Sequence, residues 1–425
     1  MKLNLWMSLA QNVRFQVLPE QDMAINWGDW VPEQILSRSD RAAYLGRRGA
    51  CISGSDSDAG SQADFVRAGS GMRANEKQGH HLTRKATCSG QFLGQSPLLK
   101  GEWVSHEDPS FHGFYKQQSQ CPDWVQGWDC QADGTDHRDM LEKEYNQVYK
   151  PFVCDMREWD LEDFGKCTEN TRMIMVGDLS MKQMFDSLAC LTRPALKSGK
   201  QTTWEESELK TDKEYTARSL QPGLHVKKKF VGDFVLDNGL HVFLRSFNVF
   251  NLTLWDDVME PFGELKDDDI LVVNFGAWYP RYSVLDPHHP WPAWQQDMKE
   301  LLMERLAAYK ARTFWRSYAA AHYGGTNGTN TFEEETARTL KEGGVCPPTK
   351  LGESWYEEYV RAFLRKCGNK CSHVSLLPVF QLTVGKPNSH MGSFGHGKDG
   401  QYLDCRLYCS NVVDQWNVLL YNLLC

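Results

Sequence analysis

The sequence lacks any run of about 18 or more apolar residues, the length that a transmembrane helix needs. Its first residues are partly apolar, but Asn4 and Ser8 interrupt them, so the N-terminus is a poor signal-peptide core. The sequence also has no phosphate-cradling glycine loop, no dinucleotide-binding fingerprint and no zinc-hydrolase motif. We therefore expect no transmembrane helix, no cofactor and no metal site.

Positive charge is also in short supply, because 47 Lys and Arg residues face 55 Asp and Glu residues, for a net charge of −8. This balance argues against general nucleic-acid binding, which depends on neutralising phosphates. Apolar residues make up 41% of the 425 residues, which is typical of a globular protein with a sizeable core. The fifteen tryptophans can serve carbohydrate stacking, but most tryptophans of a large fold lie in its core.

Cysteine, by contrast, is abundant, with thirteen residues. In an oxidising compartment most of them would form disulfides and at least one would be left over, whereas an intracellular chain would keep them reduced. Three residues separate Cys367 from Cys371, and three separate Cys405 from Cys409. Four thiolates can also close a zinc site. We favour disulfides, with free thiols and zinc as the alternatives.

The chain divides by composition into two regions. Residues 1–87 match no known pattern, and Gly49–Gly71 is rich in small and polar residues, which indicates a flexible linker. Residues 88–425 carry the periodic segments. Within them, Asp237-Asn-Gly239 lies between two alternating apolar segments, which predicts a β-hairpin.

Further along, Asp269–Trp278 is a continuous apolar run that predicts a buried parallel strand. Apolar residues at helical spacing from Trp294 to Ala308 predict an amphipathic helix, and Arg312–Tyr318 predicts the next strand. The last residues, from Val413 on, predict a packed C-terminal helix. We therefore predict a doubly wound α/β domain with a mostly parallel sheet flanked by helices, after an irregular cysteine-rich N-terminal part.

Two short segments carry the chemistry. Met173–Cys190 predicts an apolar strand, a Gly-Asp turn at Gly177-Asp178 and then a helix, a geometry that presents a nucleophile and backbone N–H groups. Asp404-Cys-Arg-Leu-Tyr-Cys409 is the second segment. Both resemble signature blocks of the trichome birefringence-like (PC-esterase) family, whose active members are polysaccharide O-acetyltransferases. The resemblance extends from Cys88 onward and implies a fold like that of SGNH/GDSL hydrolases.

The resemblance also implies a catalytic Ser–His–Asp triad, in which the histidine takes the serine proton. The family has Gly-Asp-Ser-Leu-Ser in the first block and Asp-Cys-x-His-Trp-Cys in the second. This chain keeps the aspartate as Asp404, but it has Leu179 at the serine position and Leu407 at the histidine position. Neither leucine can attack an acyl group or accept a proton.

Ser180 is the natural substitute for the missing nucleophile, and His390 for the base, which gives Ser180, Asp404 and His390 as the candidate catalytic set. Ser180 is also explained as the family's second serine, after loss of one residue, or as a hydroxyl that caps the following helix. A shift of one residue turns a helical side chain by about 100° and moves it out of an attack geometry. His396 and other histidines are further candidates for the base.

The resemblance implies a cleft around five more positions, which are Gly177, Asp178, Asn274, Arg316 and His322. The Asn274 amide, at the end of a predicted strand, could donate to an oxyanion. The family histidine that follows it is replaced by Ala277. The adjacent His288 and His289 are better explained by a loop than by a metal site, because they are not one helical turn apart.

Three functions remain in view. The first is a catalytically impaired family member that binds a polysaccharide or a protein. The second is an active O-acetyltransferase or acetylesterase that uses Ser180, and the third is a structural subunit of a larger assembly. Family resemblance favours the secretory pathway and the Golgi lumen, while the missing signal sequence leaves an intracellular assembly as the alternative. No nucleic-acid partner is expected.

Overall fold

The computed structural model describes residues 87–88, 99–108, 121–125, 145–206, 228–247, 252–276, 291–322, 346–348, 355–392 and 404–425. Residues His80–Cys425 form one compact unit, and all the described residues belong to it. The predicted boundary between residues 87 and 88 stays a prediction, because residues 1–86 lie outside the described part. No helix of the described residues is long and apolar enough to cross a membrane.

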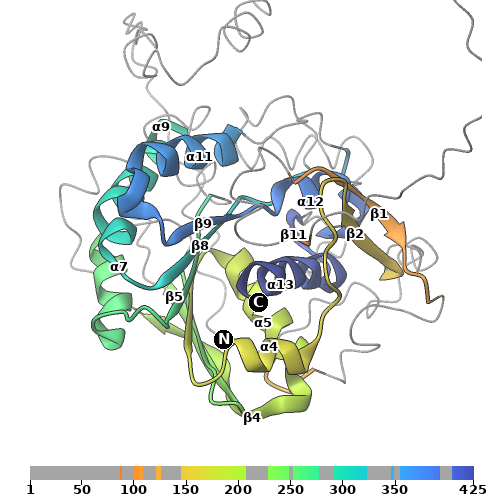
Figure 1. Cartoon of the computed structure of the whole chain (residues 1–425), viewed down its shortest axis with the longest axis horizontal. Coiled ribbons are helices and arrows are strands. Elements are labelled where there is room, and N and C mark those ends of the chain that lie inside the picture. Colours follow the sequence, from red (N-terminus) through yellow and green to blue (C-terminus); the bar gives the residue numbers. More distant parts are fainter. Residues whose placement is uncertain are drawn as a thin grey trace, which may run out of the picture. The chain divides into compact units, whose positions relative to one another are not determined.

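A mixed sheet of seven strands forms the centre of the unit, in the order β4-β5-β6-β3-β7-β8-β9 (Figure 1). The strands β6, β3, β7, β8 and β9 run parallel to one another, while β5 is antiparallel to both β4 and β6. The predicted α/β fold with a mostly parallel sheet is confirmed. The strands are β3 (Arg172–Gly177), β4 (Leu196–Glu206), β5 (Lys228–Leu236), β6 (His241–Ser246), β7 (Ile270–Asn274), β8 (Arg312–Arg316) and β9 (Val374–Leu377).

The sheet is buried on both faces, as the alternation of side chains along β3 shows. Met173 and Met175 belong to one apolar cluster, and Ile174 and Val176 belong to another. Because successive side chains of a strand point to opposite faces, the two clusters lie on the two sides of the sheet. A strand that is buried on both faces has a continuous run of apolar residues, and this run is the pattern from which the sequence predicts the strand.

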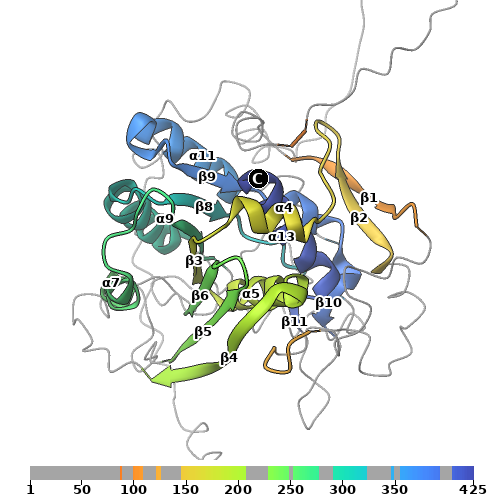
Figure 2. The same cartoon turned by 60° about the horizontal axis from the view of Figure 1, so that its bottom comes forward.

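Helices cover both faces (Figure 2). On one side lie α4 (Leu161–Cys167), α5 (Leu179–Leu191) and α13 (Ser410–Leu424), whose apolar residues join the cluster of Met173. On the other side lie α7 (Leu252–Met259), α9 (Trp291–Glu300) and α11 (Trp355–Cys367), which join the cluster of Ile174. The predicted helix after Trp294 is confirmed, and it continues from α9 through a π-helical segment, Leu301–Arg305, and a 3-10 turn, Leu306–Ala308.

The predicted hairpin is the β5–β6 pair, which is antiparallel over Phe230–Val235 and His241–Ser246. Gly239 has a φ of +86°, a conformation that an L side chain rarely adopts. A Cβ at this position would also clash with the side-chain oxygen of Asn170. The Asn-Gly signal in the sequence therefore has a direct physical cause in the turn.

Two small sheets and one short helix lie beside the main sheet. The strands β1 (Gly101–Ser105) and β2 (Gln147–Pro151) pair antiparallel, as do β10 (His390–Gly392) and β11 (Asp404–Tyr408). The short helix α12 (Phe380–Val384) is held to β1 by the Trp103 indole, which donates to the carbonyl of Leu382 at 2.8 Å. The second signature block forms β11, which leads directly into α13. β11 lies beside α5, the helix that follows the first signature block.

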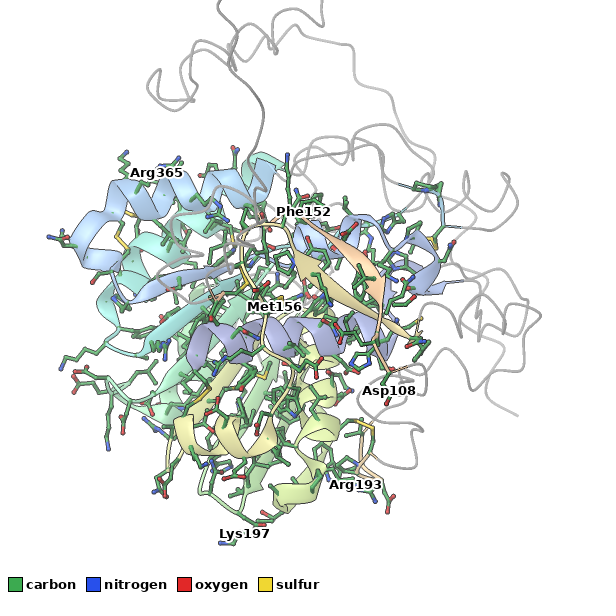
Figure 3. The ribbon with its side chains drawn as sticks, turned by 45° about the vertical axis from the view of Figure 1, so that its right-hand side comes forward. Asp108, Phe152, Met156, Arg193, Lys197 and Arg365 are labelled. Carbon is green, nitrogen blue, oxygen red and sulfur yellow. A yellow bond between two sulfur atoms is a disulfide. The ribbon has the colours of Figure 1, made fainter. Side chains whose placement is uncertain are left out.

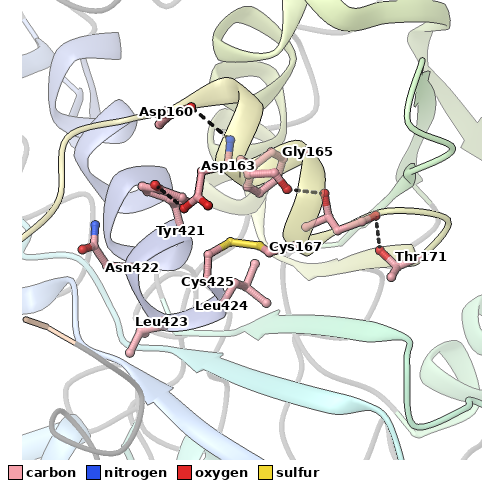
Figure 4. The surroundings of a disulfide bond; sticks show 12 residues. Asp160, Asp163, Gly165, Cys167, Thr171, Tyr421, Asn422, Leu423, Leu424 and Cys425 are labelled. Atoms are coloured by element: carbon pink, nitrogen blue, oxygen red, sulfur yellow. Dashed lines mark hydrogen bonds between the residues drawn. A yellow bond between two sulfur atoms is a disulfide. The ribbon is translucent and has the colours of Figure 1, made fainter.

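All eleven described cysteines are in disulfides. The described bridges are Cys88–Cys154, Cys121–Cys190, Cys167–Cys425, Cys346–Cys405 and Cys367–Cys371. The disulfide expectation is confirmed, and the zinc alternative for Cys367, Cys371, Cys405 and Cys409 is wrong, because their thiols are oxidised. In Figure 4, Cys425 at the end of α13 is joined to Cys167 of α4, next to the hydrogen bond between Tyr421 and Asp163.

Candidate functional site

Three parallel strands end side by side at the predicted cleft. Gly177 is the last residue of β3, Asn274 of β7 and Arg316 of β8, and β3, β7 and β8 are neighbours in the sheet. The carboxyl ends of adjacent parallel strands form one edge, where open α/β sheets bind their ligands. The order of the strands therefore brings these residues together although they are far apart in the chain.

Gly177 is required at this edge because the backbones of β3 and β7 come very close. A Cβ at Gly177 would clash with the carbonyl oxygen of Asn274. The next residue, Asp178, is the N-cap of α5, and its carboxylate accepts from the backbone N–H of Ser180 at 2.9 Å. Such a cap satisfies one of the free N–H groups of the first helical turn. The Gly-Asp turn thus has a structural role that is independent of catalysis.

The hydroxyl of Ser180 is engaged on both sides. It donates to Oδ1 of Asp178 at 2.5 Å and accepts from Nη2 of Arg316 at 2.5 Å. Only 6% of Ser180 is exposed, and Asp178 and Arg316 are fully buried. A serine nucleophile needs a neighbouring base and access for the substrate. Here the serine bridges a buried carboxylate and a buried guanidinium and is closed off from solvent.

Arg316 carries the positive charge of this cluster. Burial lowers its pKa to about 10, while the charge of Asp178 acts in the opposite direction, so the guanidinium stays protonated at neutral pH. Its Cζ lies 4.7 Å from the ring centroid of Trp416 on α13, a cation–π contact. Its Nε and Nη1 have no hydrogen-bond partner among the described residues. The aromatic face and the serine bridge are therefore what hold the cation in place.

Asn274 turns its amide nitrogen away from the serine. Nδ2 donates to the carbonyl of Arg316 at 3.0 Å and lies 3.4 Å from that of Ser317, and Oδ1 faces the hydroxyl of Ser180 at 3.4 Å. An amide nitrogen has only two hydrogens to donate. The residue therefore lies in the predicted place, but in this conformation its donors stabilise the backbone after β8.

Leu179 occupies the position that the family gives to its serine. It is the first residue of α5 and only partly buried, and it packs against the apolar cluster of Ile174. Ser180 is turned by about 100° around the helix axis relative to it. This turn carries the serine towards Arg316 and away from the more accessible side, where an aliphatic side chain now lies.

The two candidate bases, His322 and His390, contact each other instead of Ser180. Nδ1 of His322 lies 2.6 Å from Nε2 of His390, and the other ring nitrogens face the carbonyls of Val384 and Leu407, each at 3.0 Å. Tyr408 adds a hydroxyl 3.3 Å from Nδ1 of His322. Both nitrogens of both rings are thus engaged, which leaves neither ring oriented as a base for the serine.

Burial lowers the pKa of both histidines. The pKa of His322 falls to about 4, and the pKa of His390 falls well below its ordinary value, also because of the neighbouring His322. Both side chains are out of contact with water, where the charged imidazolium loses its hydration. Burial thus disfavours the charged form of both rings. An uncharged pair has two N–H groups, so it can make only two of the three contacts through the ring nitrogens as hydrogen bonds.

The second signature block places its strand against α5. Tyr408 of β11 is clamped by Gln183, which donates to its carbonyl at 2.7 Å and accepts from its N–H at 3.2 Å. Leu407 is buried beside it, at the position of the family's base. Asp404 begins β11, and its backbone pairs with Gly392 of β10. The side chain of Asp404 lies outside the described residues.

The structure thus brings Gly177, Asp178, Ser180, Asn274 and Arg316 into one cluster, and it places His322 and His390 in another. Sequence reasoning missed Gln183, Tyr408 and Trp416, which join α5 and β8 to the second block and its helix. α5 also buries other polar residues, among them Lys182 and Asp186, so the sequence did not single out Gln183. Ala277, His288, His289 and His396 lie outside the described residues. Among the described residues, no group of three or more metal-ligating side chains comes together.

Comparison with known proteins places this geometry in a family. Residues 157–423 match the model of PC-esterase, described as a GDSL/SGNH-like acyl-esterase family found in Pmr5 and Cas1p. The matched region begins before α4 and ends one residue before the end of α13, so it contains both signature blocks and every residue of the two clusters.

Similar curated proteins come from Arabidopsis thaliana. Trichome birefringence-like 40 is 24% identical over 378 residues, which cover 83% of this chain and 94% of that protein. Trichome birefringence-like 41 is 22% identical over 353 residues and trichome birefringence-like 42 is 24% identical over 346 residues, covering 89% and 88% of those proteins. Since the family match spans well over half of the sequence, this chain belongs to the PC-esterase family as a distant relative of the trichome birefringence-like proteins.

Proposed function

We propose that this chain is a non-catalytic member of the PC-esterase family, which binds a glycan or a partner protein without transforming it. One observation carries the proposal. The hydroxyl of Ser180 is buried between the carboxylate of Asp178 and the guanidinium of Arg316, where it caps a helix and bridges two charges. The position from which a family nucleophile would attack is occupied by Leu179.

The histidine pair supports the same proposal. A general base must lie within hydrogen-bond distance of the proton that it takes. The described hydrogen bonds of His390 go to His322 and to the carbonyl of Leu407. An active enzyme built on Ser180 would need both a movement of this pair and an opening of the serine cluster. Loss of a single triad member already reduces the rate by orders of magnitude.

We also propose that the protein acts in the secretory pathway. Eleven oxidised cysteines are typical of proteins that fold in an oxidising compartment, because cytosolic thiols are kept reduced. The intracellular assembly considered as the alternative predicts free thiols. Counting sulfhydryls after denaturation without reductant tests this part, and eleven or more reactive thiols would contradict it.

Serine reactivity tests the main proposal. The full chain is incubated with a fluorophosphonate probe, with Ser180→Ala as the control. We expect no stoichiometric labelling of either protein. Labelling of the unmodified chain that disappears in Ser180→Ala would mean that Ser180 is a working nucleophile, and the proposal would be wrong.

A restored variant is the matched positive control. Leu179→Ser combined with Leu407→His returns the family residues to both positions beside the unchanged Asp404. We expect this double variant to react with the probe or to release acetate from an acetylated oligosaccharide faster than the unmodified chain. Equal acetate release by both proteins, at a rate well above the background without protein, would show that the two leucines do not limit the chemistry.

A further inference from the structure

A hollow of about 230 Å³ lies between β2, the loop Cys154–Glu158 and the middle of α13. Gln415 and Val418 of α13 line it, whereas Trp416 of the same helix lies against Arg316. Since a helix with its side chains is about 10 Å across, α13 separates the hollow from the serine cluster. The hollow is therefore a different place from the family cleft.

The apolar part of the lining comes from both sides. Val148 of β2, Met156 of the loop and Val418 of α13 all border the hollow. Met156 lies beside α13 in Figure 3, and Phe152 lies just beyond the end of β2. Apolar side chains of this kind can pack against the C–H face of a sugar ring. The volume of the hollow is below the roughly 300–1,000 Å³ of pockets for drug-sized ligands. The space suits one small ring, not an extended chain.

Charged side chains of both signs border the same space. Lys150 and Arg157 contribute positive charge, and Asp155 and Glu158 contribute negative charge. The formal charge of the lining is therefore zero. A phosphate or carboxylate ligand would meet two carboxylates, and a cationic ligand would meet an ammonium and a guanidinium. A wholly apolar ligand would bury these groups without hydrogen bonds, which is costly.

Several of these groups have hydrogen-bonding capacity left over. The side chain of Lys150 is 54% exposed. Its Nζ lies 3.4 Å from Oε1 of Glu107, which is a long contact for an ion pair. Nη1 of Arg157 already pairs with Asp163 at 2.9 Å, but Nε of the same guanidinium has no hydrogen-bond partner among the described residues. Asp155 is exposed, and its backbone carbonyl accepts from Cys88 at 3.0 Å, which fixes the loop that presents its carboxylate to the hollow. The hollow thus offers both donors and acceptors.

We propose that this hollow is a saccharide site that holds one uncharged sugar ring. Sugar hydroxyls both donate and accept, so they can pair with Arg157 and with Asp155 at once, while the C–H face lies on Val148, Met156 and Val418. Phe152 follows Pro151 of the lining in the chain and is 55% exposed, so it provides a stacking surface for the next unit of the same glycan.

This inference deepens the proposed function, because it names the glycan as the ligand and adds a second contact point for it. It rests on the binding part of that function and does not depend on whether Ser180 reacts. Probe labelling of Ser180 would overturn the absence of catalysis and leave this site untouched. Failure of the binding test below would overturn this site and leave the labelling result untouched.

The test is calorimetric titration of the full chain with cellotetraose and xylotetraose, and with tetragalacturonic acid as the acidic probe, each to about 10 mM. We expect one of the neutral probes to bind with a Kd of about 1 mM or lower and the acidic probe to bind at least about tenfold more weakly. Phe152→Ala and Asp155→Asn should each weaken the neutral probe about fivefold or more.

Two matched variants control for unspecific effects. Met303→Ala removes another exposed apolar side chain, and Asp268→Asn removes another exposed carboxylate, both away from the hollow. Each should leave the Kd within about twofold of the unmodified chain. The inference is wrong if neither neutral probe binds, if the acidic probe binds as well as the neutral ones, or if Phe152→Ala and Asp155→Asn bind like the controls.

Discussion

Gln183 and Tyr408 exchange two hydrogen bonds, although 225 residues separate them in the chain. The amide of Gln183 replaces a strand partner for the backbone of Tyr408, so α5, which follows the nucleophile position, is fixed to β11, which carries the base position. The relative placement of the two signature blocks therefore depends on a buried amide that lies outside both candidate clusters.

Removal of this clamp should destabilise the fold. Gln183→Ala leaves the buried N–H and C=O of Tyr408 without partners, and each such group costs about 1–3 kcal/mol. We expect the free energy of unfolding to fall by about 2–4 kcal/mol in chemical denaturation. The control, Glu162→Ala, breaks the exposed pair with Lys166 and should cost far less, because water screens an exposed ion pair. Equal losses in both variants would contradict the role of Gln183.

Ser180 should behave as a structural residue. Ser180→Ala removes the acceptor of Arg316 and the donor to Asp178, and a buried charged group that loses its partner costs about 1–3 kcal/mol or more. Ser246→Ala is a matched comparison, because its hydroxyl makes a single neutral bond to the carbonyl of Asp178 at 3.0 Å. That variant should cost about 0.5–1.5 kcal/mol. Thermal and urea denaturation would measure both, and a smaller loss for Ser180→Ala than for Ser246→Ala would argue against the bridge.

Stability should fall at acid pH through the histidine pair. The pKa of His322 in the fold is about 4, and an unfolded histidine titrates near about 6.5. Between these values the unfolded chain binds more protons than the fold, so stability is lost as the pH falls through this window. His322 alone can contribute a loss of roughly 3 kcal/mol when the window has been crossed.

The pH effect is measured as the free energy of unfolding between pH 7 and pH 5 for the unmodified chain and for His322→Gln with His390→Gln. We expect the double variant to have a flatter dependence on pH, because it has two fewer imidazoles that must stay uncharged. His106→Gln controls for the loss of an imidazole as such. A double variant whose stability falls as steeply as that of the unmodified chain would exclude the pair as the cause.

The two bridges Cys167–Cys425 and Cys367–Cys371 should differ in their contribution to stability. The first spans 258 residues and the second spans 4. In the chain-entropy account, the long loop contributes about 5.5 kcal/mol and the short one about 2 kcal/mol. We therefore expect the double serine variant of the first pair to unfold at clearly lower denaturant concentration than that of the second. The reverse order would show that the short ring holds α11 for another reason.

The sequence predicted a structural element correctly where the residues that cause it all lie in one short segment. Asp237-Asn-Gly239 specifies its own turn, because the positive φ of Gly239 is a property of that residue. The apolar run around Ile270–Asn274 specifies a strand that is buried on both faces. The Gly-Asp turn at Gly177 and Asp178 combines a close backbone approach with a helix cap, so it was also visible in the sequence.

The contacts of the site were not visible, because they depend on which strands are neighbours. Ser180 meets Arg316 over a separation of 136 residues, since β3, β7 and β8 end at one edge of the sheet. His322 and His390 were both named from the sequence, but they meet only because both are bound to β11. The N–H of His322 donates to the carbonyl of Cys405, and β10, which begins with His390, pairs with β11. The orientation of the Asn274 amide was likewise decided by the carbonyls that surround it.

The sequence by itself determined the α/β architecture and the family, because both depend on local patterns and on the identities of neighbouring residues. Only the tertiary structure decided what the remaining polar residues do. Burial removes water from Ser180, Arg316 and the two histidines, and a polar group without water must pair with whatever the fold places beside it. In this fold those partners are other buried groups of the protein itself.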